Sequence, residues 1–316
     1  MATASSIRMN HSNLESLRRE VRGEIMNTDV LCEVIFPAQE TALAETSLDT
    51  AFTMFREFES RYSRFRRNNE LWAFNHSTES VLSPELFGIL ERILSFHQLT
   101  EGIFDPSILP ALEEAGYTST PYQQHTRRTS PLSTLILDRT TLTARKPLDL
   151  ILDLGGIGKG YIVDQVAASL HTHFEHVLVD AGGDIRVYGE NAIEHYPYFA
   201  IEVEHPLPDR PAPLLMLRDM AVATSGRNRR HWVKDGVPRH HLIDPTTDTS
   251  ADSDLLTVTV IAPTTTEADV WAKTLYIAGL KRGQALAQKH NLPAIFIPSD
   301  DTIVINSLAQ PYVWHP

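Results

Sequence analysis

One glycine-rich segment, Asp153-Leu-Gly-Gly-Ile-Gly-Lys-Gly160, constrains the fold more than any other part of the sequence, because it lies between an apolar run and an amphipathic one. This order predicts a strand, a tight turn and a helix. Glycines let backbone N–H groups approach a ligand, and a helix N-terminus adds partial positive charge, so the segment can bind a phosphate. The segment is not a P-loop, because a P-loop requires glycine in place of Asp153 and Ser or Thr in place of Gly160. It is not the dinucleotide-binding fingerprint either, because that motif requires glycine in place of Tyr161. A structural turn with a solvated lysine explains the glycines equally well.

The periodicity of the rest predicts an α+β fold: a single domain in which helices pack on a largely antiparallel or mixed sheet. The chain has 316 residues, of which 42% are apolar and 22% charged, as is typical of a globular protein with a large core. Strands are predicted at residues 30–36, 135–144, 148–154, 176–187, 255–262 and 294–306, and helices at 41–65, 83–102, 160–170, 267–279 and 281–290. Residues 26–316 contain no linker, whereas residues 1–25 are predicted to be a polar tail with a short helix at 13–22. The segment 117–131 is the least structured.

The charge balance and the single cysteine exclude several function classes. A formal net charge of −12 opposes binding to nucleic acid or to an anionic membrane surface, since both require a positive field. Cys32 alone cannot form an internal disulfide, so nothing in the chain requires an oxidising compartment. Residues 1–23 lack the apolar segment of a signal peptide, and no run approaches the roughly 18 apolar residues of a membrane helix. We therefore expect a cytoplasmic protein without membrane insertion.

The segment His240-His-Leu-Ile-Asp-Pro245 can carry proton-transfer chemistry. In an extended segment His241 and Ile243 point to one face, while His240 and Asp244 point to the other. One histidine can thus enter a site, where its near-neutral pKa makes it a proton acceptor for a hydroxyl group. A surface pair that ends at an Asp-Pro turn is the structural alternative. No third ligand stands at the short spacing of a zinc motif.

Two further motifs have both a structural and a functional interpretation. Thr264 and Glu267 form a capping box, and Asp269 with Lys273 forms an i,i+4 pair contributing about 0.2–0.5 kcal/mol. The functional interpretation turns Asp269 toward a site, where its carboxylate can bind a hard cation. The segment Ala181-Gly-Gly-Asp184 fits a hairpin turn. Spacing alone favours the structural interpretation in both cases.

The order of these motifs is more specific than any one of them. Residues 26–279 resemble the ApbE family, the FAD:protein FMN transferases, through eight short motifs. In chain order they are Met26-Asn-Thr28, Arg64-Phe-Arg66 with Glu70-Leu71 and Asn75, Phe104-Asp-Pro106, the 153–160 segment, Val179-Asp-Ala-Gly-Gly-Asp-Ile185, Ala223-Thr-Ser-Gly226, His241-Leu-Ile-Asp-Pro245 and Ala268-Asp269.

The resemblance implies an enzyme that moves the FMN half of FAD onto a threonine or serine hydroxyl of an acceptor flavoprotein and releases AMP. It implies His241 as the general base and Mg²⁺ bound by Asp269 with a loop carbonyl near Gly156, the ion bridging phosphate oxygens. The residues that it places around FAD are Met26, Phe65, Phe104, Asp105, Asp153, Gly156, Lys159, Ser225, Ile243 and Lys273.

This chain departs from the family pattern at three positions. Lys273 stands where the family commonly has threonine, and an ammonium cannot ligate Mg²⁺; it can contact the diphosphate directly or pair with Asp269. We therefore expect weak or absent metal dependence. Asp248 and Asn27 replace usual glycines, and both residue types tolerate a left-handed backbone.

Two other functions are compatible with the same residues. An FAD pyrophosphatase would use water as the acceptor and form FMN and AMP. A non-catalytic FAD carrier would have lost its metal, and with it the chemistry, to Lys273. AMP release with an acceptor, without one, or not at all separates the three.

Overall fold

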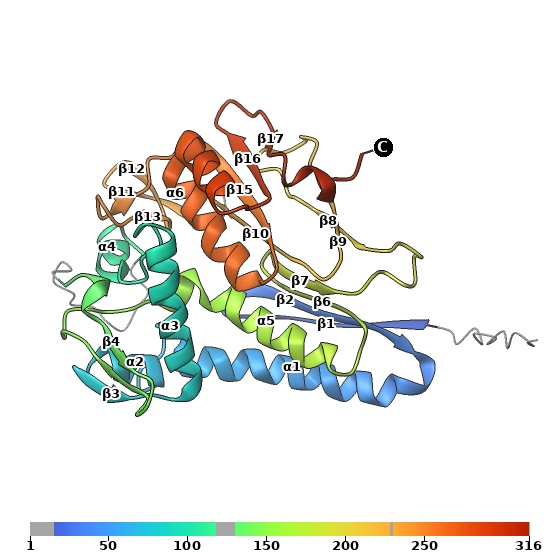
Figure 1. Cartoon of the computed structure of the whole chain (residues 1–316), viewed down its shortest axis with the longest axis horizontal. Helices are drawn as coiled ribbons and strands as arrows, with labels where there is room; N and C mark the ends of the chain where they lie inside the picture. Colours follow the sequence, from blue (N-terminus) through green and yellow to red (C-terminus); the bar gives the residue numbers. More distant parts are fainter. Residues whose placement is uncertain (1–15, 118–129, 228–229, 316) are drawn as a thin grey trace, which may run out of the picture.

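An eight-stranded antiparallel sheet forms the centre of the fold, in the order β1-β2-β6-β7-β10-β15-β16-β17 (Figure 1). The computed structural model describes residues 16–117, 130–227 and 230–315. The strands of this sheet are β1 (Ser16–Ile25), β2 (Thr28–Pro37), β6 (His176–Ala181), β7 (Asp184–Tyr188), β10 (Ala221–Gly226), β15 (Leu255–Ala262), β16 (Ala294–Pro298) and β17 (Val304–Ile305).

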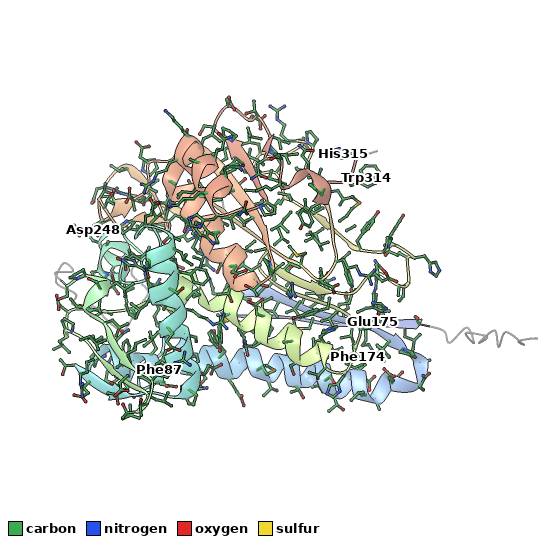
Figure 2. The ribbon with its side chains drawn as sticks, viewed as in Figure 1. Phe87, Phe174, Glu175, Asp248, Trp314 and His315 are labelled. Carbon is green, nitrogen blue, oxygen red and sulfur yellow. The ribbon has the colours of Figure 1, made fainter. Side chains whose placement is uncertain are left out.

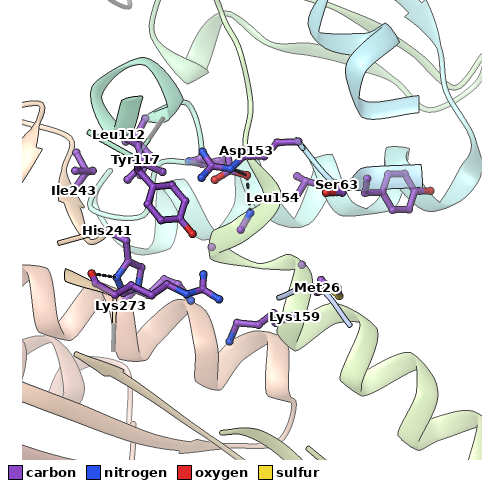
Figure 3. Close-up of a pocket in the computed structure, with 18 of the residues that line it drawn as sticks. Met26, Ser63, Leu112, Tyr117, Asp153, Leu154, Lys159, His241, Ile243 and Lys273 are labelled. Atoms are coloured by element: carbon purple, nitrogen blue, oxygen red, sulfur yellow. Dashed lines mark hydrogen bonds and ion pairs between the residues drawn. The ribbon is translucent and has the colours of Figure 1, made fainter. Parts of the chain in front are cut away.

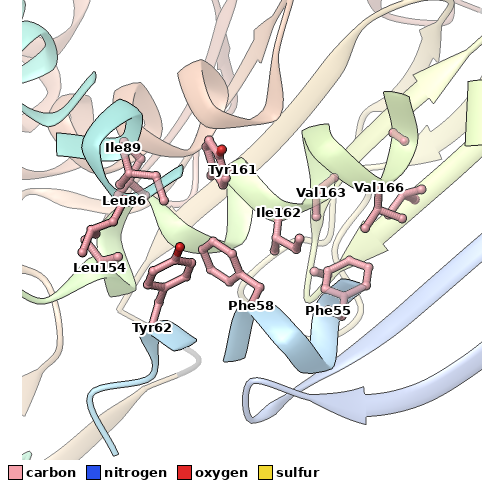
Figure 4. Close-up of a cluster of buried hydrophobic side chains, with 14 of the residues drawn as sticks. Phe55, Phe58, Tyr62, Leu86, Ile89, Leu154, Tyr161, Ile162, Val163 and Val166 are labelled. Carbon is pink, nitrogen blue, oxygen red and sulfur yellow. The ribbon is translucent and has the colours of Figure 1, made fainter. Parts of the chain in front are cut away.

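Three long helices lie side by side on one face of this sheet: α1 (Thr41–Tyr62), α5 (Gly158–His171) and α6 (Thr265–Lys289). Helix α1 contacts β1 and β2, α5 contacts β6 and β7, and α6 contacts β10 and β15, so the helices follow the order of the strands. Strand β2 alternates as predicted, because Val34 packs under the helices and Ile35 packs on the opposite face. Figure 4 shows Phe55 and Phe58 of α1 meeting Ile162 of α5 in the core between them.

Small elements cover the rest of the sheet and one end of the molecule. A hairpin of β8 (Phe199–Glu202) and β9 (Leu214–Leu217) packs on the face away from the helices. The end of the chain returns to it, since the Trp314 backbone donates to the Leu214 carbonyl at 2.8 Å (Figure 2). The remaining α-helices and strands of the described residues are α2 (Glu70–Asn75), α3 (Pro84–Leu99), α4 (Leu109–Glu114), the sheet of β3 (Glu79–Val81), β5 (Thr143–Arg145) and β4 (Ile136–Asp138), the pair β11 (His231–Lys234) and β12 (Val237–His240), and the pair β13 (Ile243–Asp244) and β14 (Thr249–Ser250).

Helices α5 and α6 are joined near their N-terminal ends. A Cβ atom added at Gly160 would lie 2.7 Å from the Thr265 carbonyl oxygen, so only glycine allows this approach. Asp164 of α5 accepts hydrogen bonds from the backbone N–H groups of Thr265 at 2.7 Å and Thr266 at 2.9 Å, and from the Thr266 hydroxyl at 2.6 Å. One carboxylate thus caps the neighbouring helix, while Thr264 caps it from within by accepting from the Glu267 N–H at 3.2 Å, as predicted.

The fold confirms the predicted α+β class. The two helices predicted at 267–279 and 281–290 form the single element α6, which is interrupted by the left-handed Gly279 (φ 74°). The helix predicted at 13–22 is wrong over residues 16–22, which belong to β1 and extend the main sheet beyond the predicted start of the domain. Leu17 and Val21 are four residues apart, a spacing that fits either structure, but both pack against the core from a strand paired with β2. No helix among the described residues is long and apolar enough to cross a bilayer.

Candidate active site

Two cavities meet beside the N-terminus of α5. The first, of about 450 Å³, is lined mainly by aromatic and apolar side chains between α1, the loop before α4 and the end of β12. The second, of about 570 Å³, is more polar and opens over β7 and β10. Six residues line both cavities: Asn27, Gly155, Lys159, Arg230, His241 and Lys273.

All the predicted site residues lie at these two cavities. Met26, Phe65, Phe104, Asp105, Asp153, Gly156 and Ile243 line the first, Ser225 and Asp269 line the second, and Lys159, His241 and Lys273 line both. Figure 3 shows Lys159, His241 and Lys273 along one side of the first cavity, with Asp153 and Leu154 across from them. Residues from both halves of the chain therefore converge on one place.

Left-handed backbone shapes two of the turns at the site, as predicted. Met26 and Asn27 join β1 to β2 with φ values of 58° and 57°, and the Met26 N–H donates to Glu59 Oε1 at 3.1 Å. Asp248 has a φ of 55°, and its N–H donates to the Asp244 carbonyl at 2.9 Å. Asparagine and aspartate adopt this conformation more readily than other non-glycine residues, which explains how they replace glycine here.

The strand predicted at 148–154 is wrong: these residues form a turn and an irregular loop before α5, because their backbone hydrogen bonds go to Asn75 and Pro106 and not to a neighbouring strand. Asn75 pairs with both backbone groups of Leu152, donating to the carbonyl and accepting from the N–H at 2.9 Å each. The Asp153 N–H donates to the Pro106 carbonyl at 2.9 Å, which ties this loop to the Phe104-Asp-Pro106 motif. A Cβ atom added at Gly156 would lie 3.2 Å from the Phe104 ring, so glycine permits close packing here.

Two buried ion pairs stand where the cavities meet. The Lys159 ammonium is bonded to Asp184, and the Lys273 ammonium is bonded to Asp269 Oδ1. Burial raises the pKa of Asp184 to about 6, the charge of Asp269 adds to this rise, and Lys159 opposes it. Burial opposes the charged form of Lys159, but the carboxylates of Asp184 and Asp269 outweigh it and raise the pKa of the ammonium. The Lys159 ammonium is therefore charged at neutral pH.

The two adjacent histidines face different surroundings, as the sequence predicts. His241 Nδ1 lies 3.3 Å from the Arg230 carbonyl oxygen (Figure 3). Burial lowers the pKa of His241 to about 3, with the positive charge of Arg230 as the next cause, so the imidazole is neutral at pH 7. His240 turns away, with its Nε2 lying 3.0 Å from the Ala251 carbonyl oxygen and its ring packing edge-on against Tyr276.

Arg64, Tyr117 and Arg230 line the first cavity but were not assigned a role from the sequence. The guanidinium of Arg64 is buried between the rings of Phe65 and Tyr117, with its carbon 4.7 Å from each ring centroid. Its Nη1 has no hydrogen-bond partner among the described residues. Arg64 stands inside a quoted motif, whereas Tyr117 begins the segment predicted to be unstructured, of which residues 118–129 lie outside the described part. Arg230 belongs to no motif, so no sequence signal marked it.

The residues expected to bind Mg²⁺ do not fit a divalent cation in this chain. Lys273 neighbours both residues to which the resemblance assigns Mg²⁺: its ammonium is bonded to Asp269, and its Cδ and Cε atoms lie 3.9 Å from the position of a Cβ atom on Gly156. The Lys273 ammonium already binds one oxygen of the Asp269 carboxylate, and an ammonium about 4 Å from a divalent cation would repel it by about 8 kcal/mol at an effective dielectric constant of about 20. Among the described residues there is no group of three or more His, Cys, Asp or Glu side chains that could hold a metal ion.

The fold is that of the flavin transferases. The flavin transferase ApbE from Vibrio cholerae superposes with a TM-score of 0.81 at 26% identity, over 94% of this chain and 99% of that one. The ApbE protein of Thermotoga maritima shares the fold with a TM-score of 0.84 at 22% identity, over 95% and 100% of the two chains.

The sequence shows the family directly. The model of the ApbE family matches residues 26–296, so the chain belongs to this family of enzymes. It is 30% identical over 263 residues to the FAD:protein FMN transferase of Vibrio cholerae, covering 78% of each chain. It is 28% identical over 319 residues to the FAD:protein FMN transferase of Treponema pallidum, covering 91% of this chain and 86% of that one.

Proposed function

We propose that this chain transfers the FMN half of FAD to a threonine or serine hydroxyl of an acceptor flavoprotein and releases AMP. The family and the names of its relatives support flavin transfer. One observation carries the proposal for this chain: Lys159, Arg230, His241 and Lys273 converge where an aromatic cavity meets a polar one. FAD has two ring systems joined by a diphosphate, and such a junction offers the diphosphate its positive charges.

The first cavity has the side chains that a flat ring system requires. Phe65, Tyr117 and Phe104 offer aromatic surfaces, and Met26 adds a polarisable thioether. Asp105 is buried at the same cavity, where its carboxylate accepts from the Ser107 N–H at 2.9 Å. We assign these residues to one of the two ring systems of FAD, and the backbone of the 153–156 loop to the neighbouring phosphate.

The reaction that we propose is a phosphoryl transfer. The acceptor hydroxyl oxygen attacks the phosphorus of the FMN half, a new P–O bond forms, and the bond to the AMP phosphate breaks. The hydroxyl proton goes to His241. Because the Arg230 carbonyl can only accept, the His241 Nδ1 that faces it carries the proton, and Nε2 is left to act as the base. The negative diphosphate counters the charge of Arg230 and so raises the basicity of His241 when FAD is bound.

Positive side chains neutralise the charge of the diphosphate in this proposal. Lys159 and Lys273 each have three N–H donors. Lys159 donates to Asp184, and Lys273 donates to Asp269 Oδ1 and to the Asp269 carbonyl oxygen at 3.4 Å, so each lysine keeps at least one donor for phosphate oxygens. Arg230 adds a third positive charge at the same junction. These contacts hold the leaving group and the reacting phosphorus in place, which is the main requirement of phosphoryl transfer.

The test is to incubate the purified chain with FAD, alone and with candidate acceptor proteins encoded in the same genome. AMP is measured by chromatography and protein-bound FMN by gel fluorescence. We expect AMP only with an acceptor that becomes fluorescent, and no product with an acceptor whose threonine is changed to valine. AMP without any acceptor would instead show an FAD pyrophosphatase, and tight FAD binding without AMP in any mixture would show a carrier.

A further inference from the structure

We infer that the ammonium of Lys273 occupies the cation position of this site, so that FAD binds and reacts without a divalent metal ion. The inference rests on the proposed function, because it concerns the charge that faces the FAD diphosphate. It starts from an ion pair inside the cavity rather than on the surface: the side chains of Lys273 and Asp269 are only 14% and 2% exposed.

The position of Lys273 is that of a ligand-binding cation. Lys273 lies one turn after Asp269 on α6 and lines both cavities, so its ammonium is at their junction. Its stem passes beside the phosphate-binding loop, since its Cδ and Cε atoms are 3.9 Å from the place of a Cβ on Gly156. A metal ion that bound both the loop at Gly156 and the Asp269 carboxylate would therefore compete with the Lys273 side chain for the same space.

The neighbouring carboxylate of Asp184 also forms an ion pair with a lysine. Asp184, the other buried carboxylate whose charge acts on this place, is bonded to the ammonium of Lys159. Mg²⁺ requires about six oxygen ligands in near-octahedral geometry, and its protein ligands are usually carboxylates. Both nearby carboxylates already have a monovalent partner, so the site holds its positive charge in fixed side chains.

The ion pair with Lys273 keeps the Asp269 carboxylate from binding a metal cation. Its second oxygen, Oδ2, is buried without a hydrogen-bond partner among the described residues. Without the Lys273 ammonium, both oxygens of this carboxylate would be open to a cation beside the Gly156 backbone. Replacing Lys273 with an apolar side chain should therefore create a divalent-metal site that the natural chain does not have.

The first experiment uses the unaltered full-length chain. Calorimetry gives the dissociation constant of FAD in EDTA and in millimolar MgCl₂, and electron paramagnetic resonance of free Mn²⁺ reports metal capture by the FAD complex, with FAD alone as the blank. We expect the same FAD affinity in both conditions and no Mn²⁺ capture. FAD binding only with Mg²⁺, or Mn²⁺ capture, would overturn the inference and leave the proposed function standing. No FAD binding in either condition would instead refute the proposed function.

The second experiment compares Lys273→Met with Lys289→Met, an exposed lysine near the end of the same helix that binds Glu101. We expect Lys273→Met to bind FAD at least about 10-fold more weakly in EDTA, as for one lost charge-assisted contact, and to recover part of this affinity with Mg²⁺ while it captures Mn²⁺. Lys289→Met should match the unaltered chain. Equal FAD affinity of the two variants in EDTA would overturn the inference. If Lys273→Met does not fold, the measurements on the unaltered chain decide.

Discussion

Replacing Asp164 with alanine should destabilise the protein and weaken FAD binding, because this carboxylate ties the start of α6 to α5 by hydrogen bonds. The change removes three hydrogen bonds and leaves the backbone N–H groups of the buried Thr265 and Thr266 without acceptors. Each buried unsatisfied group costs about 1–3 kcal/mol, so we expect a loss of about 3 kcal/mol. With an unfolding entropy of about 2.1 cal/mol/K per residue, this lowers the Tm of a chain of 316 residues by about 5 °C.

The Tm is measured by circular dichroism and the FAD affinity by calorimetry. FAD binding should weaken because Asp269 follows Thr265 by one helical turn, and Lys273 by two. Asp164→Asn keeps one acceptor oxygen and should lose less stability. Asp49→Ala, an exposed aspartate on α1, is the matched control and should change the free energy of unfolding by less than about 0.5 kcal/mol. A Tm of Asp164→Ala within about 1 °C of the unaltered chain would refute this account of the helix junction.

Three more predictions concern the site. His241→Ala should keep its FAD affinity but release AMP about 10²–10⁴-fold more slowly, as for a lost general base; unchanged turnover would move the proton transfer to another residue. Lys159→Ala combined with Asp184→Asn, which avoids an unpaired buried carboxylate, should bind FAD at least about 10-fold more weakly in calorimetry, and full affinity would make the Lys159 pair purely structural. FAD affinity should rise as the pH falls through about 6, because protonation of Asp184 removes a negative charge near the diphosphate; Asp184→Asn should abolish this rise, and a flat profile in the unaltered chain would contradict the assignment.

The sequence predicted β2 and α6 better than it predicted the edge strand β1 or the segment 148–154, which was expected to be a strand and is a loop. Strand β2 has apolar residues on alternate positions because one of its faces is buried under helices, and the glycine at 279 marked the break in α6. Strand β1 is an edge strand with charged residues at most outward positions, so its few apolar residues fit a helix as well as a strand. The pairing with β2, in a hairpin that turns at Met26 and Asn27, decides between the two.

The site shows a similar division. Motif residues such as Lys159 and His241 could be placed at one site because the family pattern orders them along the chain. Arg230 and Tyr117 belong to no such pattern of site residues. Arg230 lies just before β11 and meets His241 because β11 and β12 form a hairpin, and Tyr117 follows α4. The sequence could predict the partner of only one of the two lysines. The i,i+4 spacing marked the pair of Lys273 with Asp269, whereas Asp184 and Lys159 are brought together by the fold.

The edge strand β1 matters to the design of a shortened form of this protein. The part that matches the family begins at Met26, after the last residue of β1. A gene product trimmed to that boundary would leave β2 paired with β6 on one side only and uncover the apolar surface under Leu17, Val21 and Ile25. An exposed sheet edge can pair with the edge of another chain and cause aggregation. Precipitation of the shortened protein would therefore not be evidence that the protein lacks flavin transferase activity.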